Sequence, residues 1–176
     1  MQNNAAGNSQ ATVVYTIGHS NLPVEEWLSI LLKLGMEILI DVRSVPYSRY
    51  APQANREPLE EVVLDAGIDY IFMGVALGGR PKDEDACDVR GEVSYSRQVK
   101  TFAFTSGLTG LLDEASRHTV CLLCSEEDPS RCHRGLLIGE ELSGQGTEVR
   151  HIRGDGSIET QAEMRLRLSG GQMSLF

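Results

Sequence analysis

Residues 119–124, with the sequence Thr-Val-Cys-Leu-Leu-Cys, are the most apolar of the strand-like segments and decide the fold class. A short apolar run bounded by polar residues is typical of a strand buried on both faces of a parallel sheet. Residues 125–131 follow as a polar turn, and residues 132–142 carry a helical pattern. The segment therefore predicts a strand followed by a helix, the repeating unit of α/β proteins.

The same alternation continues on both sides of this unit. Further strands are predicted at residues 13–18, 37–42, 68–73 and 148–152, and further helices at residues 23–34, 58–66, 95–103, 108–115 and 160–168. We expect a single-domain three-layer sandwich with a mostly parallel sheet of about five strands in residues 13–168. Residues 1–12 are expected to form a disordered tail, and residues 169–176 a flexible one.

Length and charge limit the classes of function. The chain has 176 residues, and 16 basic against 25 acidic side chains give it a formal net charge of −9. The length suits one domain with a core that needs no disulfides. The acidic balance disfavours a broad nucleic-acid surface, and no secretion signal or apolar run of ~18 residues is present. We expect a cytoplasmic protein that does not enter a membrane and whose four cysteines are reduced.

Polar and charged residues follow the predicted strands at the points where they end. They are His19 and Ser20, Asp41 and Arg43, Arg80, and Cys124 with Glu126. Ligands of parallel α/β sheets bind beyond the carboxyl ends of the strands, so these residues predict one shared site. If the strand at residues 13–18 lies between those at 37–42 and 119–124, the turns face one crevice.

The cysteines leave several interpretations open. Cys121 and Cys124 have the spacing of a zinc-binding pair, but residues three apart in a strand point to opposite faces. We therefore expect no metal and no cofactor. A redox pair of Cys124 with Cys132 is a second interpretation. A phosphatase-like loop from Cys124 to Arg131 is disfavoured, because the residues between them are acidic and include no glycine.

Residues 131–134, with the sequence Arg-Cys-His-Arg, carry the densest chemistry, at the predicted start of a helix. A helix start and two arginines would lower the pKa of the Cys132 thiol. The candidate catalytic residues are Cys132, His133, His19, Asp41, Glu126 and Cys124, and the candidate ligand-binding residues are Ser20, Arg43, Arg80 and Arg134.

Several candidates have both a chemical role and a structural alternative. A thiolate at Cys132 or Cys124 would attack, His133 or His19 would transfer a proton, and Arg43 with Arg134 would bind an oxyanion. Alternatively, Cys132 is a small buried residue, Asp41 and Arg43 form a structural ion pair, and Arg134 pairs with a structural acid.

Four motifs resemble a known family when taken in order. They are TIGHS at 16–20, DVRSVP at 41–46, LGGRP at 77–81, and LCSE at 123–126 with CHR at 132–134. Together they resemble the domain-of-unknown-function family 488, over about residues 13–153. The resemblance implies a small α/β domain of bacterial type and does not imply a reaction.

The last five residues resemble a second pattern. The peptide Gln-Met-Ser-Leu-Phe at 172–176 is similar to the Gln-Leu-Ser/Asp-Leu-Phe peptide with which bacterial replication and repair proteins dock on the sliding clamp. The resemblance implies that Leu175 and Phe176 fill an apolar pocket, that Met173 replaces a leucine of similar volume, and that Gln172 forms hydrogen bonds. Alternatively, the tail folds back on its own domain.

These patterns together predict a function in bacterial DNA maintenance. We expect an enzyme that acts on a nucleotide or nucleic-acid substrate in the strand-end pocket and is recruited by the sliding clamp. One alternative is a non-catalytic sensor that binds the same ligands, and a second is a thiol-redox protein. Because the chain is acidic, a recruiting tail would compensate for weak binding of the domain to DNA.

Overall fold

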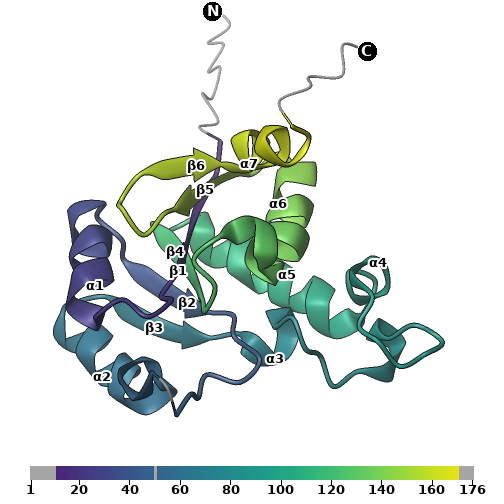
Figure 1. The fold of residues 1–176 in the computed structure, drawn as a ribbon, viewed down its shortest axis with the longest axis horizontal. Helices are drawn as coiled ribbons and strands as arrows, with labels where there is room; N and C mark the ends of the chain where they lie inside the picture. Colours follow the sequence, from purple (N-terminus) through teal and green to yellow (C-terminus); the bar gives the residue numbers. More distant parts are fainter. Residues whose placement is uncertain (1–10, 50, 171–176) are drawn as a thin grey trace, which may run out of the picture.

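The computed structural model describes residues 11–49 and 51–170, and the clamp-like peptide at 172–176 lies outside them. Its centre is a six-stranded sheet in the order β3-β2-β4-β1-β5-β6 (Figure 1). The strands are β1 (Val13–Gly18), β2 (Ile38–Asp41), β3 (Asp69–Phe72), β4 (Val120–Cys124), β5 (Glu148–Ile152) and β6 (Ile158–Thr160). The first five are parallel to one another, and β6 pairs with β5 in the antiparallel direction.

Helices cover both faces of the sheet, which confirms the three-layer α/β sandwich. The helices are α1 (Val24–Lys33), α2 (Arg56–Asp65), α3 (Gly74–Leu77), α4 (Tyr95–Gln98), α5 (Phe102–Ala115), α6 (Glu140–Gly144) and α7 (Gln161–Leu168), with a π-helix η4 (Arg134–Gly139) and 3-10 turns η1 (Pro52–Ala54), η2 (Glu84–Ala86) and η3 (Pro129–Arg131). Helices α1 and α2 lie on one side of the sheet, and α5 and α6 on the other (Figure 1). No helix within the described ranges has the length and apolar character required to span a bilayer.

The apolar strand at residues 120–124 supplies both cores. Cys121 and Leu123 pack with α1 and α2, whereas Val120, Leu122 and Cys124 pack with α5 and α6. Alternate side chains of a strand point to opposite faces, so the two cysteines are separated by the sheet. This confirms the expectation that Cys121 and Cys124 do not share one ligand.

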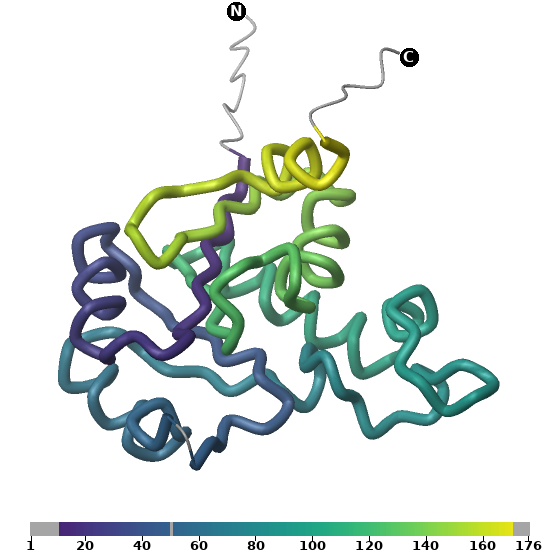
Figure 2. The backbone as a smooth tube through the Cα atoms, viewed as in Figure 1, coloured from purple at the N-terminus to yellow at the C-terminus, as the bar shows by residue number. Residues whose placement is uncertain are grey.

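Three features differ from the sequence-based expectations. The strand between β1 and β2 is β4, so β4, and not β1, occupies the middle of the candidate site. The sheet gains β6, which the sequence pattern did not predict. The predicted helices at 95–103 and 108–115 become the short α4 and the longer α5, which begins where Thr101 accepts a hydrogen bond from the Phe104 N–H. The loop at residues 82–94 extends from the body beside α4 (Figure 2).

The central position of β4 brings three turns to one edge. Backbone hydrogen bonds continue beyond the strands, from the His19 N–H to the Cys124 carbonyl at 3.0 Å and from the Val42 N–H to the Leu123 carbonyl at 3.1 Å. Gly18 is required for this approach, because a Cβ at that position would overlap the Glu126 carbonyl. The turns after β1, β2 and β4 therefore meet at the carboxyl edge.

Candidate functional site

A cleft of about 500 Å³ opens at the carboxyl edge of the sheet. Six of its lining residues were candidates from the sequence: Arg43, Arg80, Cys124, Glu126, Cys132 and His133. A second cleft of about 270 Å³ adjoins it and is lined by His19 and Ser20, sharing Arg43 and Glu126 with the first. The structure therefore gathers most of the candidates, whereas Asp41 and Arg134 line neither cleft.

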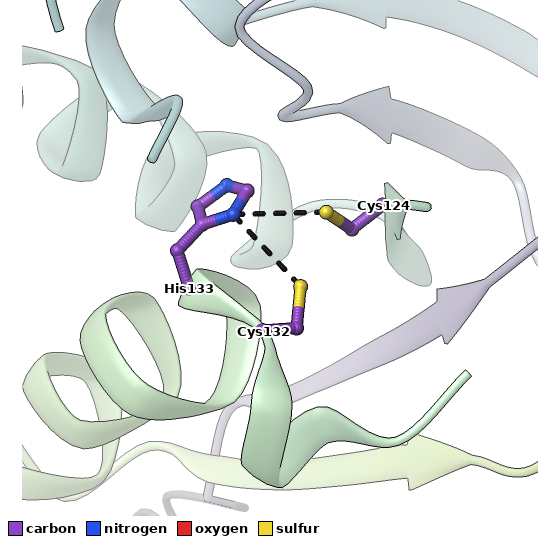
Figure 3. A group of neighbouring side chains, drawn as sticks. All are labelled: Cys124, Cys132 and His133. Atoms are coloured by element: carbon purple, nitrogen blue, oxygen red, sulfur yellow. Dashed lines mark hydrogen bonds between the residues drawn. The ribbon is translucent and has the colours of Figure 1, made fainter. Parts of the chain in front are cut away.

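Cys124, Cys132 and His133 form a compact cluster in the larger cleft (Figure 3). Nδ1 of His133 lies 3.6 Å from Sγ of Cys124 and 3.8 Å from Sγ of Cys132, and the three atoms lie within 4.8 Å of one another. Nε2 of His133 lies 3.0 Å from the Val42 carbonyl oxygen. Because a carbonyl only accepts, Nε2 carries the hydrogen, and in the neutral ring the Nδ1 lone pair faces both sulfurs.

The pKa values of the two thiols in the cluster are shifted in opposite directions. A hydrogen bond from Cys124 lowers the pKa of Cys132, and the Arg134 charge acts in the same direction, against the effect of burial. The same hydrogen bond, together with burial, raises the pKa of Cys124. Proton loss from one sulfur is thus stabilised by the other, and Cys132 is the thiol that ionises first.

The LGGRP segment shapes the wall of the cleft beside the cluster. A Cβ on Gly79 would lie 2.8 Å from Cγ of His133, so glycine lets this loop pack against the imidazole. The Arg80 N–H donates to Oγ of Ser44 at 2.8 Å, which ties the loop to the turn after β2. The Arg80 side chain is exposed at the rim, as is that of Arg131. These two guanidinium groups are the cations that a ligand would reach first.

Asp41 and Arg43 form a buried ion pair behind the cleft. The Arg43 Nε donates to Oδ1 of Asp41 at 2.9 Å and its NH2 group donates to Oδ2 at 2.6 Å, while the Tyr70 hydroxyl donates to Oδ2 at 2.7 Å. Asp41 is fully buried and Arg43 is 6 % exposed. The carboxylate is therefore saturated by protein donors and holds Arg43 in place.

His19 takes part in the same network. Its Nε2 accepts from Arg43 NH1 at 3.2 Å, so Nδ1 carries the hydrogen and donates to the Ser20 carbonyl at 2.8 Å. Burial and the Arg43 charge lower the pKa of His19, which keeps the ring neutral. Ser20 has φ of 48°, a left-handed conformation that is uncommon outside glycine. The turn after β1 thus holds His19 as a partner of Arg43.

Arg134 lies behind the cluster and is fully buried. Its guanidinium donates to the Thr16 hydroxyl at 3.2 Å, to the Glu127 carbonyl at 2.7 Å and to the Glu126 carbonyl. The sequence placed Arg134 among the ligand-binding residues because of its position at a helix start. In the structure its donors are taken by the chain itself, and it fixes the turn that carries Glu126.

A model of the family described as "Domain of unknown function DUF488" matches residues 23–139. The chain belongs to this family. The match confirms the resemblance to this family. It contains the turns after β2 and β4 and the CHR segment, whereas the TIGHS segment at 16–20 precedes it. No curated protein and no solved structure matches the chain.

Two buried residues that the sequence analysis did not identify are connected to the site by hydrogen bonds. Nδ1 of His151 accepts from the Thr16 hydroxyl at 2.8 Å, and its Nε2 donates to Oε1 of Gln161 at 2.7 Å. The same Thr16 oxygen accepts from Arg134, so the chain of hydrogen bonds reaches the site. His151 and Gln161 lie outside the family match, and no local pattern in the sequence identified them.

Proposed function

We propose that this DUF488 domain is an enzyme that acts on a nucleotide or nucleic-acid substrate at the carboxyl edge of its sheet. The observation that carries the proposal is the cluster of Cys124, Cys132 and His133 in a cleft that has two exposed arginines at its rim. Guanidinium groups bind phosphate oxygens through charge-assisted hydrogen bonds. Tyr47 and Tyr95 also line the cleft and offer rings on which a base could stack.

The cluster supplies the reactive groups in this proposal. Cys132 is the more acidic thiol, and His133 and the exposed Glu126 lie within the same cleft as proton acceptors. Arg80 and Arg131 bind the anionic part of the substrate. Asp41, Arg43, His19 and Arg134 act as positioning residues, because their polar atoms are engaged with one another or with the backbone.

The first test of this function is substrate binding. Arg80→Ala and Arg131→Ala are each expected to weaken binding of a labelled single-stranded oligonucleotide or a nucleoside triphosphate by roughly tenfold, the loss of about one charge-assisted hydrogen bond. Fluorescence anisotropy measures the affinity. Arg117→Ala removes the same charge beyond the end of α5, where Arg117 pairs with Asp113, and should leave binding unchanged.

Analysis of the ligand after incubation distinguishes an enzyme from a sensor. Mass spectrometry of the incubated ligand should reveal a product that disappears when Cys132 is replaced by serine. Saturable binding with the ligand recovered intact would instead establish the non-catalytic module. Equal affinities for Arg80→Ala, Arg131→Ala and the parent would contradict the assignment of this cleft.

Recruitment by the sliding clamp is the second part of the proposal. It rests on the Gln-Met-Ser-Leu-Phe peptide and on the net charge of −9, which disfavours independent binding to DNA. Removal of residues 172–176 is expected to abolish retention of the clamp in a pull-down. Because buried anchor residues carry at least about 2 kcal/mol each, Leu175→Ala should weaken clamp binding by roughly 30-fold.

A matched variant makes the tail experiment specific. Ser174→Ala alters the central residue of the same peptide without removing an apolar anchor, and it should retain most of the binding. Isothermal titration with purified clamp gives the affinities. Equal binding by the intact and the truncated chain would refute recruitment through the tail and leave the cleft chemistry untouched.

A thiol-redox protein is a second candidate, favoured by the proximity of the Cys124 and Cys132 sulfurs within 4.8 Å. A disulfide between them would release two electrons and two protons to an oxidant such as a peroxide. Reversible loss of two titratable thiols after mild peroxide, absent in Cys132→Ser, would support this function. An unchanged thiol count would eliminate it.

A further inference from the structure

The geometry points to a zinc site formed by Sγ of Cys124, Sγ of Cys132 and Nδ1 of His133. The catalytic use of such an ion rests on the proposed function, whereas its binding does not. The sequence argued against zinc because Cys121 and Cys124 point to opposite faces of the sheet. In the structure the sulfur near Cys124 is that of Cys132, and not that of Cys121. Cys124 and Cys132 lie on the same face of the sheet, so the argument from opposite faces does not exclude zinc binding by this pair.

The distances within the cluster fit a single tetrahedral ion. Zinc bonds of about 2.3 Å to sulfur and about 2.0 Å to nitrogen imply a sulfur–nitrogen separation of about 3.5 Å and a sulfur–sulfur separation of about 3.8 Å. The two sulfur–nitrogen separations are 3.6 and 3.8 Å, and all three atoms lie within 4.8 Å of one another. Ligation would therefore require changes of a few tenths of an ångström in the sulfur–nitrogen separations and of at most about 1 Å between the two sulfurs.

The orientation of His133 supports ligation more than hydrogen bonding. Two sulfurs approach the single lone pair of its Nδ1, at 3.6 and 3.8 Å, and a hydrogen bond can connect only one of them to it at a time. A cation located among the three atoms can bind all of them at once. The Nε2–H donates to the Val42 carbonyl at 3.0 Å, the outer contact that typically fixes the tautomer and orientation of a metal-binding histidine.

The donor types select the class of metal. Two sulfurs and one imidazole nitrogen suit zinc, whereas magnesium and calcium prefer oxygen ligands. Two thiolates and a neutral imidazole also balance the charge of a divalent ion, which favours binding at a buried position. Cys124 and Cys132 are each 3 % exposed and His133 is 9 % exposed.

Three protein ligands leave the fourth position for water or substrate, as in catalytic zinc sites. All three residues line the 500 Å³ cleft, so this position can face the substrate. Oε2 of Glu126 lies 3.4 Å from Sγ of Cys124. With zinc bound, Cys132 and His133 would act as ligands and would no longer serve as nucleophile and proton acceptor. In a hydrolysis, Glu126 would accept a proton from the water, the water oxygen would form the new bond, and Glu126 would return the proton to the leaving group. The substrate class is then a nucleotide or nucleic acid with a hydrolysable bond.

Metal analysis of the full chain tests the site. The protein, expressed with added zinc and purified without chelators, is expected to contain one zinc ion per chain by mass spectrometry. Cys124→Ser, Cys132→Ser and His133→Gln should each reduce zinc affinity by roughly 100-fold or more, because even outer-shell changes cost about 10–100-fold. Cys87→Ser is the control, since Cys87 belongs to the loop after η2, away from the cluster.

A spectroscopic arm covers variants that fold poorly. Addition of Co²⁺ to the metal-depleted parent should produce thiolate-to-cobalt charge-transfer absorption, and Zn²⁺ should abolish it. Folded parent protein that binds no zinc and gives no cobalt band would overturn the site, and so would a Cys124–Cys132 disulfide isolated in place of the metal. Failure of the proposed function is a separate result, namely unchanged oligonucleotide binding in Arg80→Ala and Arg131→Ala with zinc retained.

Discussion

Asp41→Asn is expected to lower the free energy of unfolding by about 3–5 kcal/mol, the usual cost of leaving one charge of a buried ion pair without its partner. Asparagine keeps the shape of the side chain but removes the negative charge that faces Arg43. It also replaces one acceptor oxygen by an amide donor. In the parent protein each carboxylate oxygen of Asp41 accepts two hydrogen bonds, so in the variant the two donors that face the amide group would lose their acceptor.

In Asp41→Asn the Arg43 guanidinium could not easily move into solvent to reduce this cost. The guanidinium is 6 % exposed and is also bound to the Ala54 carbonyl at 2.7 Å and to His19. Arg43→Met alone should be similarly costly, because it leaves the Asp41 carboxylate buried and unpaired. The double variant Asp41→Asn with Arg43→Met should be less unstable than the sum of the two single changes.

Urea denaturation followed by the fluorescence of the buried Trp27 measures these energies. Asp113→Asn is the matched control, since it removes one partner of an exposed pair with Arg117 and should cost less than about 1 kcal/mol. Comparable losses for Asp41→Asn and Asp113→Asn would refute the structural role of the buried pair. Simple additivity in the double variant would show that the two side chains do not interact.

Asp41→Asn should also alter the position of His133 in the site, through the backbone of the turn after β2. The Arg43 N–H donates to Oδ1 of Asp41 at 3.0 Å, and the preceding Val42 carbonyl holds Nε2 of His133. Displacement of this turn would therefore change the orientation of the imidazole. Because Asp41 lines neither cleft, we expect it to affect the site only through this turn.

The sequence predicted the layers of the fold because its first five strands are signalled by local apolar runs. Strand β6 gives no comparable signal, since Ile158–Thr160 has three residues and its Ile158 is exposed. Strand order depends on hydrogen bonds between strands that are far apart in the sequence. The central place of β4, between β2 and β1, depends on such pairing and cannot be derived from any one segment.

The candidate site was predictable by location and less so by role. The rule for parallel sheets identified the strand-end turns, and most of the candidates line the two clefts. A guanidinium requires oxygen acceptors, but its residue type does not say whether the ligand or the protein supplies them. Arg134 donates to a backbone carbonyl of the protein. Arg131, which was not among the candidate ligand-binding residues, lines the cleft.

The cysteine cluster shows the same limit. Sequence spacing drew attention to Cys121 and Cys124, which are three residues apart, while the structure joins residues eight and nine positions apart. The turn at 125–128 makes this possible, because Arg134 holds its carbonyls and Arg153 holds the Glu127 carboxylate at 2.9 Å. These tertiary contacts determine which side chains meet.

Acidification from pH 6.5 to about pH 4 is expected to destabilise the protein by about 3 kcal/mol through His151 alone. Burial, together with the Arg134 charge, lowers the pKa of His151 to about 4, against an ordinary value of 6.5. Above pH 6.5 the ring is neutral in both the folded and the unfolded chain, and its contribution is complete. Between the two pKa values the unfolded chain binds a proton that the folded chain does not, so stability falls with pH.

The hydrogen bonds explain why the folded protein rejects this proton. Nδ1 of His151 accepts from the Thr16 hydroxyl, and Thr16 in turn accepts from the buried Arg134. A second proton on the ring would place two donors against each other and a new charge near the guanidinium. Burial lowers the pKa of His19 as well, which adds a loss of the same sign.

Urea denaturation at a series of pH values tests this prediction through a slope, which does not depend on the stability of a variant at neutral pH. The parent should lose up to about 1.4 kcal/mol per pH unit between pH 6.5 and 4 from this group, and His151→Gln should lose correspondingly less. If His151→Gln and the parent have the same slope, the buried ring is not the group that makes the fold sensitive to acid. If the slope flattens, the His151 imidazole is the group whose protonation destabilises the fold, at the position where it is connected through Thr16 to the buried Arg134.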